Sequence, residues 1–423
     1  MLFLETNGLI YSLQSGFRPS FSTDSALIHL SDLIRQNMDK GLYTGALLLD
    51  LQKAFDTVNH SILLSKFQAM GMNKSTVTWF KSYLSQRKQF VDISGTRSPE
   101  GVISCGVPQG SILGPLMFLV YVNDMNSATS CKLFLYADDS VLVTTGKDLT
   151  EIERTLSSEL QNIQVWLEIN KLSLHLGKTE SIVFGSKQKL KRGAKIQVKC
   201  KDTTIVNKDK IKYLGITLDQ DMSGVSQGNS VIQKINGNLK FLYRKCFFLS
   251  QREKKMVCSA LLQASFDYGC NIWYRGLKSI LKKKLQTAQN KMMRFILGFG
   301  SRHHISAKDF TDLDILNLAG RMDYLTVAHF YDIYHGTAPS YLRNAIRVAD
   351  VHSHNTRNSS LNFMVPAVKS QGKLEFMFNG IKVWNALPDE VKLSYSKPIF
   401  KRKVKSHFLY EMGALESESF IFN

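Results

Sequence analysis

The order of hydrophobic and polar residues predicts strands and helices mixed through the first half of the chain. Ala46–Leu49 is a short apolar run that ends at Asp50, as expected of a buried strand. Leu133–Tyr136 and Val141–Val143 are apolar runs separated by Ala-Asp-Asp-Ser, which predicts a β-hairpin with two carboxylates at its turn. The other strand candidates are Gln89–Ile93, Pro99–Ile103, Ser181–Phe184 and Tyr213–Leu218.

Helical periodicity is strongest in two places. Apolar residues recur every three or four positions from Leu149 to Ile169, which predicts an amphipathic helix, and Ile62–Leu84 has similar spacing with a break near Gly71. The second half is mostly helical, with an apolar stripe from Leu277 to Ile296 and lysines beside it. Ser, Gly, Gln and Asn cluster at Met222–Ser230, which suggests a domain boundary. The lysine-rich segment 187–201 is expected to be a loop or exposed hairpin.

Composition and charge favour a folded protein with a polyanionic partner. The 423 residues are 44% hydrophobic, enough for a sizeable core and two or three domains. Of the net charge of +19, +18 comes from residues 186–300, where 24 Lys and Arg stand against 6 Asp and Glu. A basic block of this kind suits binding to a phosphate backbone. For any single lysine, an ordinary solvated surface position is the simpler interpretation.

Cysteine and histidine positions argue against zinc sites and secretion. The six cysteines include no CxxC pair and no Cys/His cluster with zinc spacing, so reduced thiols of an intracellular protein are expected. No apolar run approaches transmembrane length, and residues 1–10 lack the layout of a signal peptide, so no membrane partner is expected.

Three aspartates form the candidate catalytic site. If the strand before Asp50 lies beside the hairpin that carries Asp138 and Asp139, the three carboxylates converge at one edge of a sheet. Carboxylate oxygens suit Mg²⁺, and two such ions catalyse nucleotidyl transfer by activating a hydroxyl and stabilising the leaving pyrophosphate. A lone Asp-Asp pair in a turn is weak evidence, because turns favour aspartate.

The residues around these aspartates resemble the ordered motifs of reverse transcriptases. Leu48–Asp56 resembles motif A, and Tyr136–Asp139 resembles motif C. The remaining matches are Gly16–Thr23 with the upstream fingers motif, Gly106–Ser111 with motif B, Leu174–Thr179 with motif D, and Tyr213–Ile216 with the primer grip. Six motifs in one order are far more specific than any one of them.

The residues within these motifs are most similar to those of LINE-type (non-LTR) retrotransposons of the jockey-like kind. Lys53–Val58 and Gly110–Pro115 are typical of that group, and Val383–Pro388 with the basic segment after it resembles the end of such polyproteins. The chain begins close to the Gly16 motif, without the family's further fingers structure or endonuclease domain. We therefore expect an N-terminally truncated copy. No ribonuclease-H pattern or zinc-knuckle spacing is present.

The resemblance implies roles for individual residues. Asp50 and Asp138 are the implied main metal ligands, with Asp139 as the second carboxylate of the pair. Phe55 is the implied steric gate against a ribose 2′-hydroxyl, with a core aromatic as the alternative. Gln109 and Gly110 are implied to lie near the nucleotide.

Two basic residues are further candidates for contacts with the substrate. Arg18 is a candidate triphosphate contact, because a guanidinium matches phosphate geometry, and Lys178 is a candidate proton donor to pyrophosphate. An ordinary surface position is the alternative for each of them. Trp384, in the C-terminal region, is expected to be a packing residue.

The predicted fold is therefore α+β, a right-hand polymerase with an antiparallel palm sheet. Partial fingers and palm are expected over residues 1–222, a basic helical thumb over 223–300, and a C-terminal helical region of unknown role over 301–423. The implied function is RNA-directed DNA synthesis with two Mg²⁺ ions, an RNA template, a DNA primer and deoxynucleoside triphosphates. Target-primed integration would place it in the nucleus.

Two rival hypotheses remain open at this stage. Another palm polymerase is possible, but a group II intron maturase should end in a maturase domain. A viral RNA polymerase should carry Gly-Asp-Asp and a small or polar residue in place of Phe55. A decayed copy that binds nucleic acid without catalysis would explain the basic middle third equally well.

Overall fold

A computed structural model describes residues 1–191, 193–346 and 361–419, and the chain divides into two compact units. The first unit is Met1–Ala26 with Leu42–Asp209, and the second is Leu27–Gly41 with Lys210–Asn423. The units therefore meet in sequence at 209–210 rather than at the expected 222, and most of an N-terminal helix belongs to the second unit. Helices account for 52% of the structure and strands for 13%, which confirms the α+β class.

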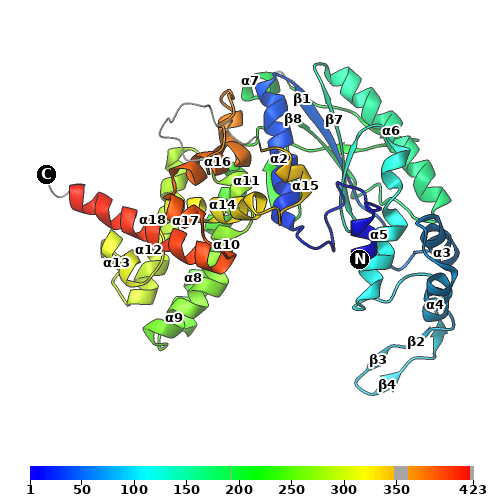
Figure 1. Cartoon of the computed structure of the whole chain (residues 1–423), viewed down its shortest axis with the longest axis horizontal. Helices are drawn as coiled ribbons and strands as arrows, with labels where there is room; N and C mark the ends of the chain where they lie inside the picture. The colour runs from blue at the N-terminus through cyan, green and yellow to red at the C-terminus, as the bar shows by residue number, and fades with distance from the viewer. Residues whose placement is uncertain (192, 347–360, 420–423) are drawn as a thin grey trace. The chain divides into compact units, whose positions relative to one another are not determined.

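A five-stranded sheet forms the centre of the first unit, in the order β11-β8-β1-β7-β6 (Figure 1). Its central strand β1 is antiparallel to β7 and β8, β6 and β7 form a hairpin, and β11 is parallel to β8. The strands are β1 (Tyr43–Leu49), β6 (Lys132–Tyr136), β7 (Asp139–Gly146), β8 (Glu180–Phe184) and β11 (Val206–Asn207). The predicted buried strand, the hairpin and the strand at 181–184 are confirmed.

Helix α6 (Leu149–Ile169) packs along β1 and β7, and its predicted bounds are confirmed. The Asp148 side chain begins the helix by accepting a hydrogen bond from the Glu151 amide at 3.3 Å. The predicted apolar stripe is buried. Gly45 permits the close approach, because a Cβ there would lie 2.3 Å from the Ile152 Cγ2 atom.

Among the remaining helices of the first unit, the sequence pattern did not predict α5 (Leu113–Val122), and the segment 187–201, expected to be a loop or exposed hairpin, begins with the short helix α7 (Lys187–Leu190). The segment 62–84 is two helices, α3 and α4, separated at Gly71 as expected, with Gly71 at a φ of 80°. Helix α5 is almost entirely apolar, so it lacks a helical period that would have revealed it. These helices are α1 (Leu2–Thr6), α3 (His60–Ala69), α4 (Lys74–Leu84), α5 (Leu113–Val122), η1 (Met125–Ala128) and α7 (Lys187–Leu190).

Short two-residue strands complete the first unit. The predicted strands at 89–93 and 99–103 occur only as brief pairings of β2 with β5 and β3 with β4, and all four strands are solvent exposed. The two-residue strands outside the central sheet are β2 (Lys88–Gln89), β3 (Asp92–Ile93), β4 (Thr96–Arg97), β5 (Gly101–Val102), β9 (Lys199–Cys200) and β10 (Thr203–Thr204).

The Lys210–Asn423 part of the second unit begins with a hairpin where the pattern predicted one strand. β12 (Lys210–Tyr213) pairs with β13 (Ile216–Asp219), and the turn between them uses Leu214 at a φ of 43° and Gly215 at a φ of 79°. Positive φ at both central residues is the geometry of a type I′ turn. The Tyr268 hydroxyl donates to the Leu214 carbonyl at 2.6 Å and so supports this turn. The single-strand prediction for 213–218 was wrong.

The rest of the second unit is helical. The expected boundary at 222–230 was wrong, because α8 runs through most of that segment, while the apolar stripe ending at Ile296 is confirmed as helix α12. None of the helices in the described ranges is both long and apolar enough to span a membrane. The helices are α2 (Thr23–Asp39), α8 (Val225–Lys245), α9 (Gln251–Cys258), the π-helix η2 (Ser259–Gln263), α10 (Ala264–Asp267), α11 (Cys270–Trp273), α12 (Ser279–Leu297), α13 (Ala307–Asp312), α14 (Leu318–Tyr334), α15 (Ser340–Arg343), η3 (Gly372–Leu374), α16 (Phe376–Ala386), α17 (Asp389–Lys392) and α18 (Lys397–Ser419).

Trp384 is a core residue of the second unit, as expected. Its side chain is fully buried, and its ring lies 5.5 Å from Phe330 on α14 and 5.7 Å from Phe400 on α18. The indole N–H donates to the Leu361 carbonyl at 3.0 Å, which satisfies its only polar group. The Trp384 motif therefore stabilises the C-terminal helices by packing.

Helix α2 is attached to this region by buried charges. The Asp32 carboxylate accepts hydrogen bonds from the Phe376 and Met377 amides at 2.8 and 3.1 Å, so it caps the start of α16 from another helix. Arg35 donates to the Met222 carbonyl at 2.9 Å. Burial raises the pKa of Asp32 to about 6 and, with the nearby Asp32 charge, the pKa of Glu375 to about 7.

These raised pKa values predict a loss of stability as pH rises. A carboxyl whose folded pKa exceeds its unfolded value costs nothing at low pH, and its penalty develops as pH rises through the folded pKa. The unfolding free energy of the parent chain should fall between pH 5 and pH 8. We expect this fall to be smaller by about 1 kcal/mol in Glu375→Gln. Urea unfolding at both pH values measures this, with the exposed Glu390→Gln as the control. Parallel curves for Glu375→Gln and the parent would contradict the assignment.

Candidate active site

The catalytic candidates lie where two strands of the central sheet end. Tyr136 pairs with Asp139, so Ala137 and Asp138 form a two-residue turn between β6 and β7. Ala137 has a φ of 57°, a position that usually takes glycine in the type II′ turns of hairpins. Because Leu49 on β1 pairs with Ser140 on β7, the register continues to Asp50 beside Asp139. The backbone positions of the three aspartates therefore lie at one edge of the sheet.

The three carboxylates interact electrostatically. Burial and the charges of Asp138 and Asp50 raise the pKa of Asp139 above its usual value. The Asp50 carbonyl accepts a hydrogen bond from the His175 amide at 2.7 Å, which fixes the backbone at the end of β1. Lys178 follows in the same segment, and its ammonium lies 4.0 Å from the Asp50 Oδ2 atom. Lys178 therefore lies at the site, although its side chain is 66% exposed.

The donor set fits a hard divalent cation, because it offers carboxylate oxygens on neighbouring strand ends. Within the described ranges, no three His, Cys, Asp or Glu side chains are already close enough together to hold a metal ion.

Phe55 lies on a supported aromatic surface. Its ring stacks on Phe118 of α5, with centroids 4.3 Å apart and an interplanar angle of 20°, and Phe17 contacts it edge-on at 6.2 Å. Phe118 is fully buried, whereas Phe55 is only partly buried. A ring that is packed against a buried ring and is still partly exposed to solvent can act as a steric wall. Its role against a 2′-hydroxyl stays a prediction.

The loop that carries Phe55 is tied to the loop that carries Gln109. The Val107 backbone amide donates to the Phe55 carbonyl at 2.9 Å, and the side-chain nitrogen Nε2 of Gln109 donates to Asp56 Oδ1 at 2.7 Å. Gly106 is required here, because it has a φ of 87° and a Cβ would lie 2.7 Å from the Asp56 carbonyl oxygen. Gly110 is exposed, with a φ of 76° and open space around it.

Arg18 has a structural role that the sequence did not predict. Its Nε and one terminal nitrogen donate to the two oxygens of Glu5, each at 2.7 Å, and the other terminal nitrogen donates to the Tyr11 and Gln14 carbonyls at 3.1 and 2.8 Å. The side chain is only 8% exposed. The alternative of a surface arginine is wrong. Contact with a triphosphate stays a prediction, and in this structure the guanidinium is directed to the protein itself.

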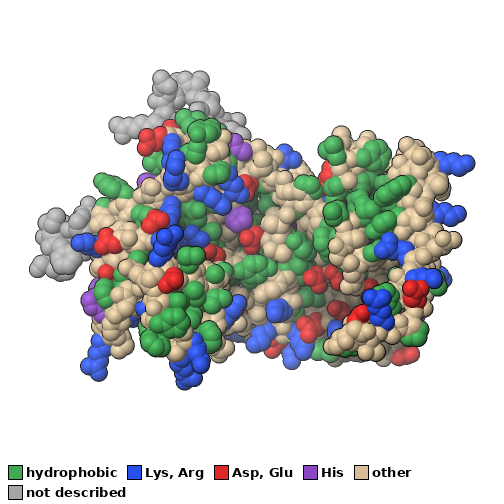
Figure 2. Space-filling view, turned by 90° about the horizontal axis from the view of Figure 1, so that it is seen from below, with side chains coloured by type: hydrophobic (Ala, Val, Ile, Leu, Met, Phe, Trp, Pro, Cys, Tyr) green, Lys and Arg blue, Asp and Glu red, His purple; other side chains and the backbone are tan. Residues whose placement is uncertain are grey.

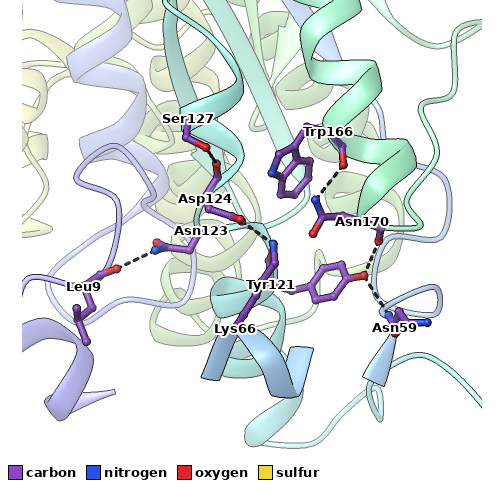
Figure 3. A network of polar contacts seen from close by, with 9 residues as sticks. All are labelled: Leu9, Asn59, Lys66, Tyr121, Asn123, Asp124, Ser127, Trp166 and Asn170. Carbon is purple, nitrogen blue, oxygen red and sulfur yellow. Dashed lines mark hydrogen bonds and ion pairs between the residues drawn. The ribbon is translucent and has the colours of Figure 1, made fainter. Parts of the chain in front are cut away.

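The sequence analysis missed a polar network behind α5 (Figure 3). The Lys66 ammonium donates to the Tyr121 carbonyl at 2.6 Å and to Asp124 Oδ1 at 2.5 Å, at the C-terminal end of the helix. The Tyr121 hydroxyl donates to the Asn170 carbonyl and accepts from the Asn59 amide at 3.2 Å. A cation at this end of α5 also complements the helix dipole. The network holds the helix that supports Phe55.

Gln14 was also missed. It lies beside the Ala137–Asp138 turn, and its side chain is fully buried. Its proximity in sequence to the Gly16 motif was the only available signal, because contact with a turn more than a hundred residues away leaves no local pattern.

This arrangement, with two carboxylates on a hairpin turn and a third on the adjacent strand end, defines the palm of a nucleotide polymerase. A family model described as reverse transcriptase (RNA-dependent DNA polymerase) matches residues 3–218, which is half of the chain, so the chain belongs to the reverse transcriptase family. Members of this family generally use divalent metal ions.

Relatives come from non-LTR retrotransposons. The chain is 29% identical over 294 residues to the probable RNA-directed DNA polymerase from transposon BS of Drosophila melanogaster, covering 67% of this chain and 32% of the relative. It is 27% identical over 300 residues to the polymerase from mobile element jockey of the same organism, covering 68% and 32%. The chain thus spans about a third of the length of these relatives.

Solved structures with some likeness include a telomerase from Candida tropicalis in complex with a fragment of telomeric RNA. It has 14% sequence identity and a TM-score of 0.39, and the match covers 97% of this chain and 56% of the telomerase. A telomerase from Candida albicans has 13% identity and a TM-score of 0.37, with 78% and 55% covered.

The raised pKa of Asp139 predicts a stability cost that a cation relieves. Ionisation of Asp139 costs free energy as pH rises through its raised pKa, so Asp139→Asn should be more thermostable than the parent chain at pH 7.5 without divalent ions. Millimolar Mg²⁺ should raise the melting temperature of the parent by about 1–3 °C and that of the variant by less.

Thermal unfolding followed by circular dichroism tests this prediction, with the exposed Asp202→Asn as a charge-matched control in the same unit. The control should respond to Mg²⁺ as the parent does. A variant that is less stable than the parent without the cation would contradict the stability cost assigned to the ionisation of Asp139.

Proposed function

We propose that the chain catalyses RNA-templated DNA synthesis, with two Mg²⁺ ions held by Asp50, Asp138 and Asp139. The observation that carries this proposal is the register that brings Asp50 beside the Asp138–Asp139 turn. In the reaction the 3′-oxygen of a primer attacks the α-phosphorus of a deoxynucleoside triphosphate. The bond to the β-phosphate oxygen breaks and pyrophosphate leaves. The bound ions would acidify the primer hydroxyl and neutralise charge on the pyrophosphate.

The surrounding residues supply orientation and selection. Phe55 forms the wall beneath the incoming sugar, where a 2′-hydroxyl would clash with the ring. Gln109 and Gly110 lie on the loop next to it, and the exposed Gly110 backbone allows close approach of a nucleotide. Lys178, whose ammonium lies 4.0 Å from Asp50, would give a proton to the departing pyrophosphate. Arg18 would reach a triphosphate only by leaving its bond network with Glu5.

A basic groove in the second unit supports nucleic acid as the partner. The groove has a volume of about 670 Å³ and lies between α8 and α12. Its cations are Lys240, Arg244, Lys291 and Arg294, and Tyr243, which is 47% exposed, supplies an aromatic ring. Among the described residues that line the groove, none is acidic.

Cations around an exposed ring suit a strand that offers phosphates and bases together. On the face drawn in Figure 2, basic side chains are mixed with acidic and apolar ones. The groove is therefore a more specific signal than the net charge. The template would be RNA and the primer DNA. Synthesis at a nicked chromosomal end would place the reaction in the nucleus.

Primer extension tests the proposed function. The chain should incorporate labelled deoxynucleotide on poly(rA) primed with oligo(dT) in the presence of Mg²⁺, and Asp138→Ala with Asp139→Ala should reduce incorporation by roughly a thousandfold or more, because ligands for both ions are lost. Binding of the primed template should be similar for both chains and should weaken with salt.

The binding measurement separates two outcomes. If neither chain synthesises DNA but both bind RNA in a salt-dependent manner, the non-catalytic alternative is correct, in which the basic groove remains in use without the reaction. If the parent chain extends the primer and the double variant does so equally well, the three aspartates are not the catalytic site.

Phe55 should decide the choice of sugar. Phe55→Val shortens the wall while keeping an apolar side chain, so we expect the efficiency of ribonucleotide incorporation relative to deoxynucleotide to rise by roughly tenfold or more. The ratio of kcat/KM values is the measurement, because it is independent of the fraction of active protein. Phe90→Val, at an exposed aromatic of the same unit, is the matched control. An unchanged ratio for Phe55→Val would leave Phe55 as a packing residue only.

A further inference from the structure

The segment Leu13–Gly16 lies against the strand that leads into the catalytic turn. The Leu135 amide donates to the Leu13 carbonyl at 3.0 Å, and the Ser15 amide donates to the Leu135 carbonyl at 2.8 Å, so the segment makes a parallel bridge with β6. Because β6 is the last strand of the sheet, this segment covers an otherwise open edge. It runs toward Ala137, the first residue of the turn.

Gln14 supplies a hydrogen-bond acceptor to that turn. Its Oε1 atom accepts from the Ala137 amide at 3.4 Å and from the Gly16 amide at 3.0 Å. Ala137 adopts a φ of 57°, which is costly for a residue with a Cβ, and Asp138 follows it directly. An acceptor for the Ala137 amide therefore favours the backbone conformation from which the Asp138 side chain projects.

The burial of Gln14 indicates that the acceptor is what matters. The side chain is fully buried, and its Nε2 atom has no hydrogen-bond partner in the part of the chain that the structure describes. An unpaired buried amide nitrogen is destabilising, and an apolar side chain of similar size would avoid that cost. Position 14 thus holds an energetically unfavourable residue. The side-chain atom that forms hydrogen bonds, Oε1, faces the turn.

Two neighbours hold Gln14 in place. Gly16 has no Cβ, and a Cβ there would lie 2.4 Å from the Ala137 nitrogen, so only glycine allows the segment to come this close to the turn. Arg18 Nη1 donates to the Gln14 carbonyl at 2.8 Å, while Nε and Nη2 of the same guanidinium donate to the Glu5 carboxylate. The buried position of Arg18 is explained by this contact.

We infer that Gln14 is a positioning residue that sets the conformation of the Ala137–Asp138 turn and thereby the orientation of the Asp138 carboxylate for cation binding. The inference rests on the proposed function only for its catalytic consequence. Its structural consequence, an ordered turn and a stronger cation site, is measurable without DNA synthesis.

Gln14→Met is the test, because methionine has a similar size and no strong acceptor. We expect at least a threefold faster hydrogen–deuterium exchange in the peptide containing Ala137, and at least a threefold weaker affinity for Mn²⁺ followed by electron paramagnetic resonance. In primer extension, kcat should fall at least tenfold, with little change in affinity for primed template. Ser181→Ala, which removes a buried hydroxyl on β8, is the control and should leave all these values unchanged.

Each outcome decides a different point. Unchanged exchange and unchanged Mn²⁺ affinity in Gln14→Met would overturn the inference, whether or not the chain synthesises DNA. If the parent chain fails to extend primers while Gln14→Met still loosens the turn and weakens Mn²⁺ binding, the proposed function fails and the positioning role stands. A loss of kcat with unchanged exchange and cation affinity would also overturn it, because the effect would then arise elsewhere.

Discussion

The pairing register of the central sheet is the constraint on which the candidate active site of the first unit depends. The pairing of Leu49 with Ser140 places Asp50 beside Asp139, and backbone hydrogen bonds on both sides of β1 prevent the strands from separating. Only the side chains are left to move apart. The nearby ammonium of Lys178 is exposed and 4.0 Å away, so solvent screens much of its effect. The sheet therefore maintains a concentration of negative charge that a cation would relieve.

Two long-range supports keep this geometry while the charges oppose it. Leu13–Gly16 binds the edge strand next to the catalytic turn, and the network around Lys66 and Tyr121 fixes the end of α5. Both use buried polar groups, which gain most from hydrogen bonds where water is excluded. Sites mounted on rigid elements keep reacting groups within fractions of an ångström, which loops alone do not achieve.

Features with a local sequence signal were predictable, and features that depend on distant contacts were not. Short apolar runs revealed β1 and the β6–β7 hairpin, helical periodicity revealed α6, and motif order singled out the three aspartates. Helix α5 was missed because it is apolar on all sides. The attachment of α2 to α16 was missed because Asp32 and Phe376 are 344 positions apart. The burial of Arg18 was missed for a similar reason: Glu5, which the guanidinium binds, stands outside the motif that drew attention to Arg18.

The selectivity proposed for Phe55 depends on the same rigidity. A wall rejects one extra oxygen by clash only if it cannot yield, and a lone ring on a loop would rotate away at small cost. Here the ring stacks on fully buried Phe118, and its carbonyl is bonded to Val107. Phe118 belongs to α5, whose far end is held by Lys66. Sugar discrimination at Phe55 and the partly buried ammonium of Lys66 are thus linked through one helix, although no sequence motif connects them.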